Sequence, residues 1–156
     1  MTTVVEMAST QEQFSQGALL FRAYAQFLGV DLEFQGFSSE LKNVAHMYGP
    51  PKGALLLAKH QGSYVGVVGL REFAPGVAEM KRMFVSEYCH GKGIGKMLMK
   101  SFLSEASRLG YQKIYLDTIP ELQSALQLYR SFGFEEIGPY RFNPHPEAIF
   151  LERGLP

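Results

Sequence analysis

The sequence predicts a mixed α/β fold, in which helices pack against one sheet that is mostly antiparallel. Two apolar segments, 54–60 and 64–73, are separated by "QGS" and are typical of an antiparallel hairpin. A third strand-like segment, 77–85, follows a Pro-Gly turn. A glycine-rich loop, an amphipathic helix and a strand at 113–118 come next, and this order predicts one parallel strand pair in the sheet.

Periodicity and turn residues predict the remaining elements. Apolar residues recur at helical spacing from Ile94 to Leu109, and Gly110 is placed to end that helix. Pro120 suits the first turn of the last helix, which Gly133 ends. We expect further strands at 3–7, 134–138 and 147–152, and further helices at 11–28 and 39–48. The sheet should therefore have about six to seven strands and about four helices around it.

Length and composition predict one globular domain that spans residues 1–156. The chain is 46% hydrophobic and 19% charged, which is ordinary for a domain that buries a core. Its 15 basic and 15 acidic residues give a net charge of +0, which argues against a general nucleic-acid binder. The first residues lack a basic segment followed by an apolar core, and the apolar runs are far shorter than a membrane span. We expect a cytoplasmic protein with no nucleic-acid or membrane partner.

Cys89 is the only cysteine, so the chain can form no internal disulfide and no cysteine metal cluster. We expect no metal site. The cysteine borders a glycine-rich loop, but the only histidine close to it in sequence is His90, and no acid completes a nucleophilic pair. Covalent catalysis through Cys89 is therefore disfavoured.

The loop "CHGKGIGKML" (89–98) has glycines at 91, 93 and 95, between a strand and a helix. Glycine lets the backbone turn sharply and lets a ligand approach its N–H groups. The first N–H groups of a helix lack internal partners, and the helix dipole favours an anion there. This arrangement predicts a phosphate-binding loop, with Lys92 and Lys96 adding positive charge. A turn that merely connects two elements is the alternative.

Two nucleotide motifs fail at this loop. A P-loop requires serine or threonine after Gly-Lys, but Met97 follows Lys96 here. A dinucleotide fingerprint requires the spacing G-x-G-x-x-G, whereas the glycines here are spaced G-x-G-x-G. The ligand is therefore expected to be a phosphate compound of another kind.

The text "MKRMFVSEYCHGKGIGKMLMKSFLSEASRLGYQKIYLDT", with "ALQLYRSFGF" after it, resembles the core of the GNAT superfamily of acyl-CoA N-acyltransferases. The phosphate loop of that family reads Arg/Gln-x-x-Gly-x-Gly/Ala, and His90–Gly95 matches it except at the first position. The resemblance extends from about residue 64 to 152. It implies the GNAT fold, in which the fourth and fifth strands splay into a V.

The resemblance also implies acetyl-CoA as cosubstrate. The loop amides would hold its pyrophosphate, and its pantetheine arm would lie in the V and bond to the backbone of the fourth strand. The implied coenzyme-binding residues are Met83, Phe84, Val85, His90, Gly91, Lys92, Gly93, Ile94, Gly95 and Lys96. The implied activity is direct transfer of the acetyl group to a primary amine of a small molecule.

Two residues match catalytic positions of the family. Tyr129 in "LYRSFGF" matches the tyrosine that protonates the leaving thiolate in many members, although it also continues an apolar helix stripe. Glu79 matches a general base of some members, and the alternative is a carboxylate paired with Lys81 or Arg82. Deprotonation of the amine through water is a further alternative to Glu79.

The sequence departs from the family at two coenzyme positions. His90 stands where arginine or glutamine is usual, so the charge beside the phosphates should depend on pH near neutrality. Alternatively, this position acts mainly through its backbone. Leu122 stands where many members have an asparagine that contacts the coenzyme.

The acceptor pocket is expected between the N-terminal segment and the loop 139–150. The candidate pocket residues are Arg22, Tyr24, Phe34, Gln35, Tyr140, Arg141 and Asn143. Arginine side chains suit an acceptor with a carboxylate. Because a fold does not fix an activity, a non-catalytic acyl-CoA-binding or sensing module is the alternative function. Many members of the family dimerise, so a homodimer is one open assembly state.

Overall fold

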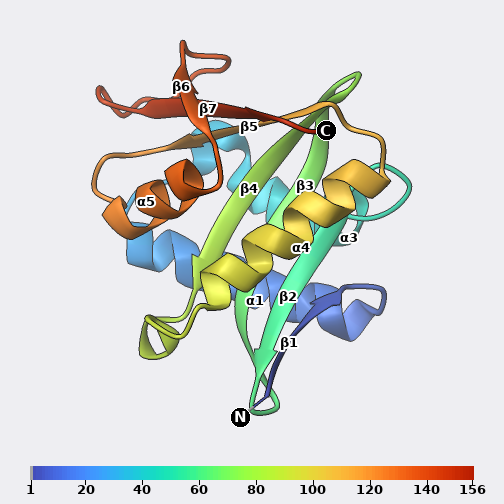
Figure 1. Ribbon diagram of the computed structural model, residues 1–156. Coiled ribbons are helices and arrows are strands. Elements are labelled where there is room, and N and C mark those ends of the chain that lie inside the picture. Colours follow the sequence, from blue (N-terminus) through green and yellow to red (C-terminus); the bar gives the residue numbers. More distant parts are fainter. Residues whose placement is uncertain (1) are drawn as a thin grey trace.

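The computed structural model describes residues 2–156, so the first residue of the predicted 1–156 domain lies outside it. Seven strands form one sheet in the order β1-β2-β3-β4-β5-β7-β6, and only the β4–β5 pair is parallel (Figure 1). The predicted mixed, mostly antiparallel sheet is therefore confirmed. The strands are β1 (Thr3–Met7), β2 (Ala54–His60), β3 (Ser63–Ala74), β4 (Val77–Val85), β5 (Lys113–Thr118), β6 (Glu135–Ile137) and β7 (Ile149–Gly154).

Five α-helices and two short 3-10 helices join the strands. They are α1 (Gln11–Leu28), η1 (Glu33–Gln35), α2 (Phe37–Lys42), α3 (Val44–Met47), η2 (Glu87–Cys89), α4 (Ile94–Arg108) and α5 (Gln123–Ser131). Thr10 caps α1 by accepting a hydrogen bond from the Gln13 amide, as part of a capping box. Of the helices formed by residues 2–156, not one combines the length and apolarity that a membrane span requires.

Two helix boundaries differ from the sequence expectation. The single helix expected at 39–48 is split into α2 and α3 at Asn43, whose amide side chain donates 2.8 Å to the Ser39 carbonyl. Asparagine competes in this way with the backbone bonds that would continue a helix. The last helix begins at Gln123 rather than near Pro120, because Leu122 has a non-helical ψ of 65°.

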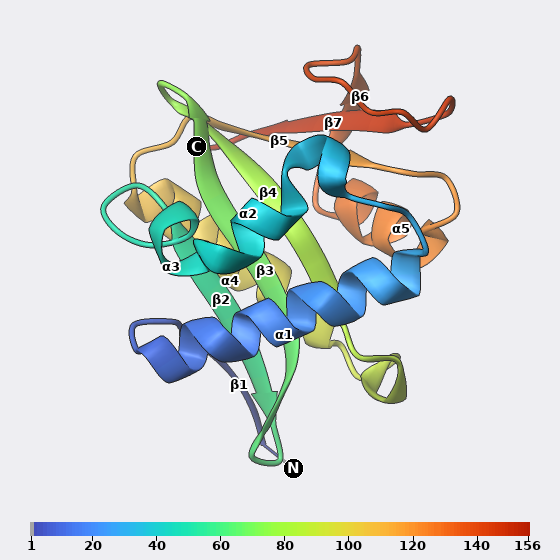
Figure 2. The ribbon, with the colours of Figure 1, turned by 180° about the vertical axis from the view of Figure 1, so that it is seen from behind.

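Both faces of the sheet are covered. Alternate residues of β2 point to opposite faces, and Leu55 and Leu57 pack with α1 and α3, whereas Leu56 packs with α4. Figure 1 shows α4 crossing one face, and Figure 2 shows α1, α2 and α3 over the other. Helix α5 belongs to the same core cluster as α4. A strand buried on both faces explains why β2 is a continuous apolar run.

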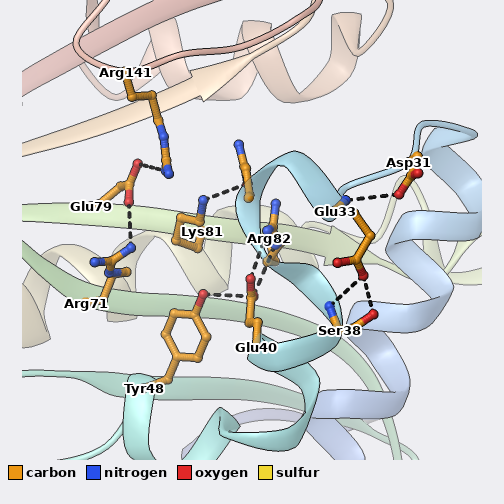
Figure 3. A network of polar contacts seen from close by, with 11 residues as sticks. Asp31, Glu33, Ser38, Glu40, Tyr48, Arg71, Glu79, Lys81, Arg82 and Arg141 are labelled. Atoms are coloured by element: carbon orange, nitrogen blue, oxygen red, sulfur yellow. Dashed lines mark hydrogen bonds and ion pairs between the residues drawn. The ribbon is translucent and has the colours of Figure 1, made fainter.

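A buried ion pair attaches α2 to β4. The register between β3 and β4 shifts at a bulge, where Arg82 has a φ of +61°. Its guanidinium donates to both carboxylate oxygens of Glu40, at 2.9 and 3.2 Å, and the Tyr48 hydroxyl donates to Glu40 at 2.9 Å (Figure 3). Both charged side chains are almost fully buried. Each therefore depends on the other for compensation of its charge.

We predict that Glu40→Gln lowers the free energy of unfolding by about 3–5 kcal/mol, because it leaves the Arg82 guanidinium buried without a counter-charge. Urea unfolding of both proteins measures the difference. The control is Glu72→Gln, which removes the exposed pair with Lys52 at 3.3 Å and should cost less than about 1 kcal/mol. Equal losses in the two variants would contradict the prediction.

Candidate active site

Strands β4 and β5 separate soon after they meet. Their ladder joins Val77–Glu79 only to residues 113–115, yet β4 continues to Val85 and β5 to Thr118. Residues 116–118 of β5 pair with β7 and not with β4. The backbone of β4 from residue 80 onward therefore has an edge that β5 does not cover, and the predicted splay is confirmed.

A cleft of about 260 Å³ lies at this splay. Its walls come from α1 and η1, from residues 80–82 of β4, from residues 117–119 at the end of β5, and from the loop 143–145. Because segments from both ends of the chain meet here, this cleft is the natural place for a ligand in the fold.

The glycine loop leads from the end of β4 to the start of α4. Gly91 and Gly93 have φ of +80° and +77°, a conformation that favours glycine. Gly93 is the N-cap of α4, and no side chain caps the helix there. The first intrahelical bond runs from the Met97 amide to the Gly93 carbonyl at 3.1 Å. The amides of residues 94–96 precede it and can therefore bind an anion at the positive end of the helix dipole.

Gly95 has a different role in the same loop. A Cβ there would lie 3.4 Å from Cδ2 of Leu128. A Cβ would therefore just contact α5, and the Gly95 backbone is not in the left-handed region.

The His90 side chain points back to β4. Its Nε2 donates to the Val85 carbonyl at 2.7 Å, and the residue is exposed. Lys92 and Lys96 are also exposed beside the start of α4. The imidazole thus attaches the loop to the last residue of β4, while the two lysines provide positive charge near the free amides.

Glu79 is fully buried, with two hydrogen-bond donors at its Oε2 and no hydrogen-bond partner at its Oε1 among the described residues. Its Oε2 accepts from the Tyr140 hydroxyl at 2.7 Å. Figure 3 shows its two arginine partners: Arg141 donates to Oε2 at 2.8 Å, and Arg71 lies 3.6 Å from Oε1 as an ion pair. The Tyr140 ring stacks on Tyr115 with centroids 4.7 Å apart. Burial raises the pKa of Tyr140, which keeps its hydroxyl protonated as a donor.

Two charged side chains face the cleft from the two splayed strands. Lys81 on β4 is 4% exposed, and its Nζ donates to the Gln35 side chain at 2.9 Å. Burial, with Arg82 next to it, lowers the pKa of Lys81 from 10.5 to about 8. Asp117 on β5 accepts from the Asn143 amide at 3.0 Å.

Tyr129 on α5 is buried in the core cluster that includes α4, and its ring lies 6.0 Å from that of Phe134. Burial is the main cause that raises its pKa, and the nearby charges of Tyr24 and Asp117 raise it further. Both of these residues line the cleft. Tyr129 itself is not among the residues that line the cleft.

Comparison with known proteins identifies this architecture. The model of the acetyltransferase (GNAT) family matches residues 20–134. The chain belongs to this family. The match includes the splayed strands, the glycine loop, α4 and α5, and it confirms the resemblance found in the sequence.

Several relatives support the assignment. An uncharacterized N-acetyltransferase of Schizosaccharomyces pombe is 38% identical over 85% of this chain and 83% of its own length. The IAA acetyltransferase of Azospirillum brasilense is 32% identical over 67% of this chain and 70% of its own length. The crystal structure of a GNAT-family acetyltransferase from Staphylococcus aureus has a TM-score of 0.81 and 23% identity, over 99% of this chain and 100% of that one. This last likeness shows the GNAT fold.

The structure brings part of the predicted acceptor set into the GNAT cleft. Tyr24, Phe34, Gln35 and Asn143 all line it. The other three predicted residues lie elsewhere. Arg22 is exposed on α1, whereas Tyr140 and Arg141 contact Glu79, which is not among the residues that line the cleft.

Sequence reasoning missed Lys81 and Asp117 as cleft residues. The sequence signal for Lys81 was a lysine in a strand buried on both faces, where burial of a charged side chain is unfavourable. The signal for Asp117 was weaker, because alternation in "KIYLDT" is compatible with a solvent-facing carboxylate. Only the splay of β4 from β5 turns both side chains toward one space.

We predict that Lys81→Met makes the protein more stable than wild type by about 2 kcal/mol at pH 7, because it removes a buried cation. Between pH 8 and 10.5 the unfolded wild-type chain holds a proton at Lys81 that the folded protein has lost, so wild-type stability rises with pH there. The advantage of Lys81→Met should therefore shrink over this window.

Urea unfolding from pH 7 to 10 measures this difference. Lys100→Met is the control, because Lys100 is exposed on α4 and its removal should shift stability equally at each pH. A difference between Lys81→Met and wild type that stays constant with pH would contradict the prediction.

Proposed function

We propose that this GNAT protein transfers an acetyl group from acetyl-CoA to a primary amine of a small molecule by direct transfer. The observation that supports it most is the uncapped N-terminus of α4, which follows the stretch of β4 that β5 leaves uncovered. The relatives named as N-acetyltransferases support the same reaction class. We infer that the cleft lined by Tyr24 and Lys81 receives the amine.

The proposed coenzyme site combines the start of α4 with the exposed edge of β4. The amides of residues 94–96 would bind the pyrophosphate, and Lys92 and Lys96 would add positive charge. The backbone of Met83–Val85, on the β4 edge that β5 leaves uncovered, would bond to the pantetheine arm. Bound acetyl-CoA supplies the acetyl group as a thioester. The His90 bond to the Val85 carbonyl links the phosphate and pantetheine parts of this surface.

Tyr129 is the proposed acid. In direct transfer the amine nitrogen bonds to the acetyl carbon, the carbon–sulfur bond breaks, and the departing thiolate needs a proton. Because burial raises the pKa of Tyr129, its hydroxyl stays protonated at neutral pH and is available as that donor.

Glu79 and water remain the two proposed routes for removing the proton of the amine. Glu79 is held by Arg71, Arg141 and Tyr140 rather than at the cleft surface. A proton would therefore reach Glu79 through the Tyr140 hydroxyl or an intervening water.

The first test is coenzyme binding. Acetyl-CoA should raise the melting temperature of wild type, because a ligand that binds only the folded state stabilises it. We predict that Gly93→Ala weakens binding about tenfold or more, since the left-handed backbone of the N-cap no longer forms without strain. Gly62→Ala is the matched control, because Gly62 also has a positive φ with open space around it, in the β2–β3 turn.

Thermal shift and calorimetry with acetyl-CoA measure these effects. Equal binding by the two alanine variants would argue against the α4 N-terminus as the pyrophosphate site. Stabilisation by ATP with magnesium, but not by acetyl-CoA, would argue for a nucleotide-binding protein instead.

We predict that Tyr129→Phe lowers turnover about 10- to 100-fold, the usual loss for a missing general acid, with unchanged acetyl-CoA affinity. Thiol release across a panel of amines measures it. Phenylalanine keeps the ring against Phe134, so stability should be nearly unchanged. A rate near that of wild type would show that Tyr129 only packs.

A non-catalytic acyl-CoA-binding or sensing module is the second candidate. Leu122 favours it, because this apolar side chain lines the cleft where many family members have a coenzyme-binding asparagine. Stabilisation by acetyl-CoA without thiol release on any amine of the panel would support this alternative.

A further inference from the structure

One buried cation in the cleft lacks a counter-charge from the chain. Lys81 is 4% exposed, and its Nζ donates to the neutral side chain of Gln35 at 2.9 Å. Within residues 2–156, no carboxylate forms an ion pair with it. Burying a charge without a partner costs several kcal/mol, so the position of Lys81 is unfavourable for the free protein.

The two acids near Lys81, Glu79 on β4 and Glu40 on α2, already form ion pairs with arginines. Figure 3 shows Lys81 between Glu79 and Arg82. Glu79 contacts Arg141 at 2.8 Å and Arg71 at 3.6 Å, and the partner of Arg82 is Glu40 at 2.9 Å. Of the charged groups that influence Lys81, Arg82 and Arg141 disfavour its cation, whereas Glu79 and Asp117 favour it.

We infer that the acceptor amine also carries a carboxylate, and that Lys81 binds this carboxylate. The inference rests on the proposed acetyl transfer and deepens it. An ammonium has three donor hydrogens, and the bond to Gln35 uses one of them. A ligand carboxylate in the cleft would supply the missing counter-charge and accept a charge-assisted hydrogen bond.

Asp117 gives the cleft a second, opposite charge. It lies on β5, the strand that has splayed from β4, and its carboxylate accepts a hydrogen bond from the neutral Asn143 amide. A cation on one strand and an anion on the other suit a molecule that carries both an ammonium and a carboxylate. Free amino acids and compounds like them form this class.

The arginines of the cleft region do not serve this purpose. Arg141 is bound to Glu79, and Arg82 is bound to Glu40. An acceptor carboxylate at either guanidinium would have to displace a buried protein carboxylate, which is costly. Lys81 is therefore the cation that the cleft offers to a ligand.

The experiment compares each amino acid with its carboxamide as acceptor, by thiol release with acetyl-CoA. Wild type should have a kcat/KM about 10- to 100-fold higher for the carboxylate than for the carboxamide. Lys81→Met should reduce that ratio to about one, mainly by raising KM for the carboxylate. Lys100→Met, at an exposed lysine, is the control and should keep the wild-type ratio.

A third variant separates binding from proton transfer. Lys81→Arg keeps a positive charge but cannot act as a base near neutral pH, because arginine does not lose its proton. If Lys81 binds the carboxylate, this variant retains a preference for carboxylate acceptors. Loss of turnover on carboxylate and carboxamide alike in both Lys81 variants would instead identify Lys81 as a base and overturn the inference.

Calorimetry of amino acid binding gives a readout that does not need turnover. At pH 8, wild type should take up protons on binding a carboxylate, because the anion favours the ammonium form of Lys81, and Lys81→Met should take up none. Equal use of carboxylate and carboxamide, or no amino acid binding at millimolar concentrations, overturns the inference. Absence of acetyl-CoA binding overturns the proposed function instead.

Discussion

The short ladder between β4 and β5 determines the rest of the functional architecture. Three residue pairs join these strands, whereas β5 and β7 are joined by six. The sheet therefore consists of two parts, β1–β4 and β5–β7, which are joined only between residues 77–79 and 113–115. The separation of the strands leaves the backbone of β4 beyond residue 79 free for a ligand, and residues of both strands line the cleft there.

Strand β4 also concentrates buried charge beside that cleft. Glu79 is neutralised by Arg71 from β3 and by Arg141 from the loop after β6, and Arg82 is neutralised by Glu40 from α2. Each partner comes from a different part of the chain, so the ion pairs hold both walls of the cleft to the same strand. Lys81 lies between these pairs, and its environment is the electrostatic feature that most distinguishes the cleft.

Local signals in the sequence predicted most of the fold. The capped helix 11–28 and the strands 54–60, 77–85 and 113–118 were predicted to the residue, because each is bounded by a strong turn or cap. The break at Asn43 and the late start of α5 depend on single backbone conformations, which periodicity does not detect. For the site, four predicted acceptor residues line the cleft, but the ion partner of Glu79 was sought at its neighbours Lys81 and Arg82. Its actual partners include Arg141, 62 positions away, which only the folded chain brings close.

The contact between Glu40 and Arg82 limits how the acceptor side can be redesigned. The segment that carries η1, α2 and α3 contributes η1 to one wall of the cleft, and exchanging it for that of another GNAT protein is an obvious way to change specificity. A graft without an acid at the position of Glu40 would leave the guanidinium of Arg82 buried without a counter-charge, next to Lys81. Chimeras built on this protein therefore need to exchange Arg82 together with the helices that face it.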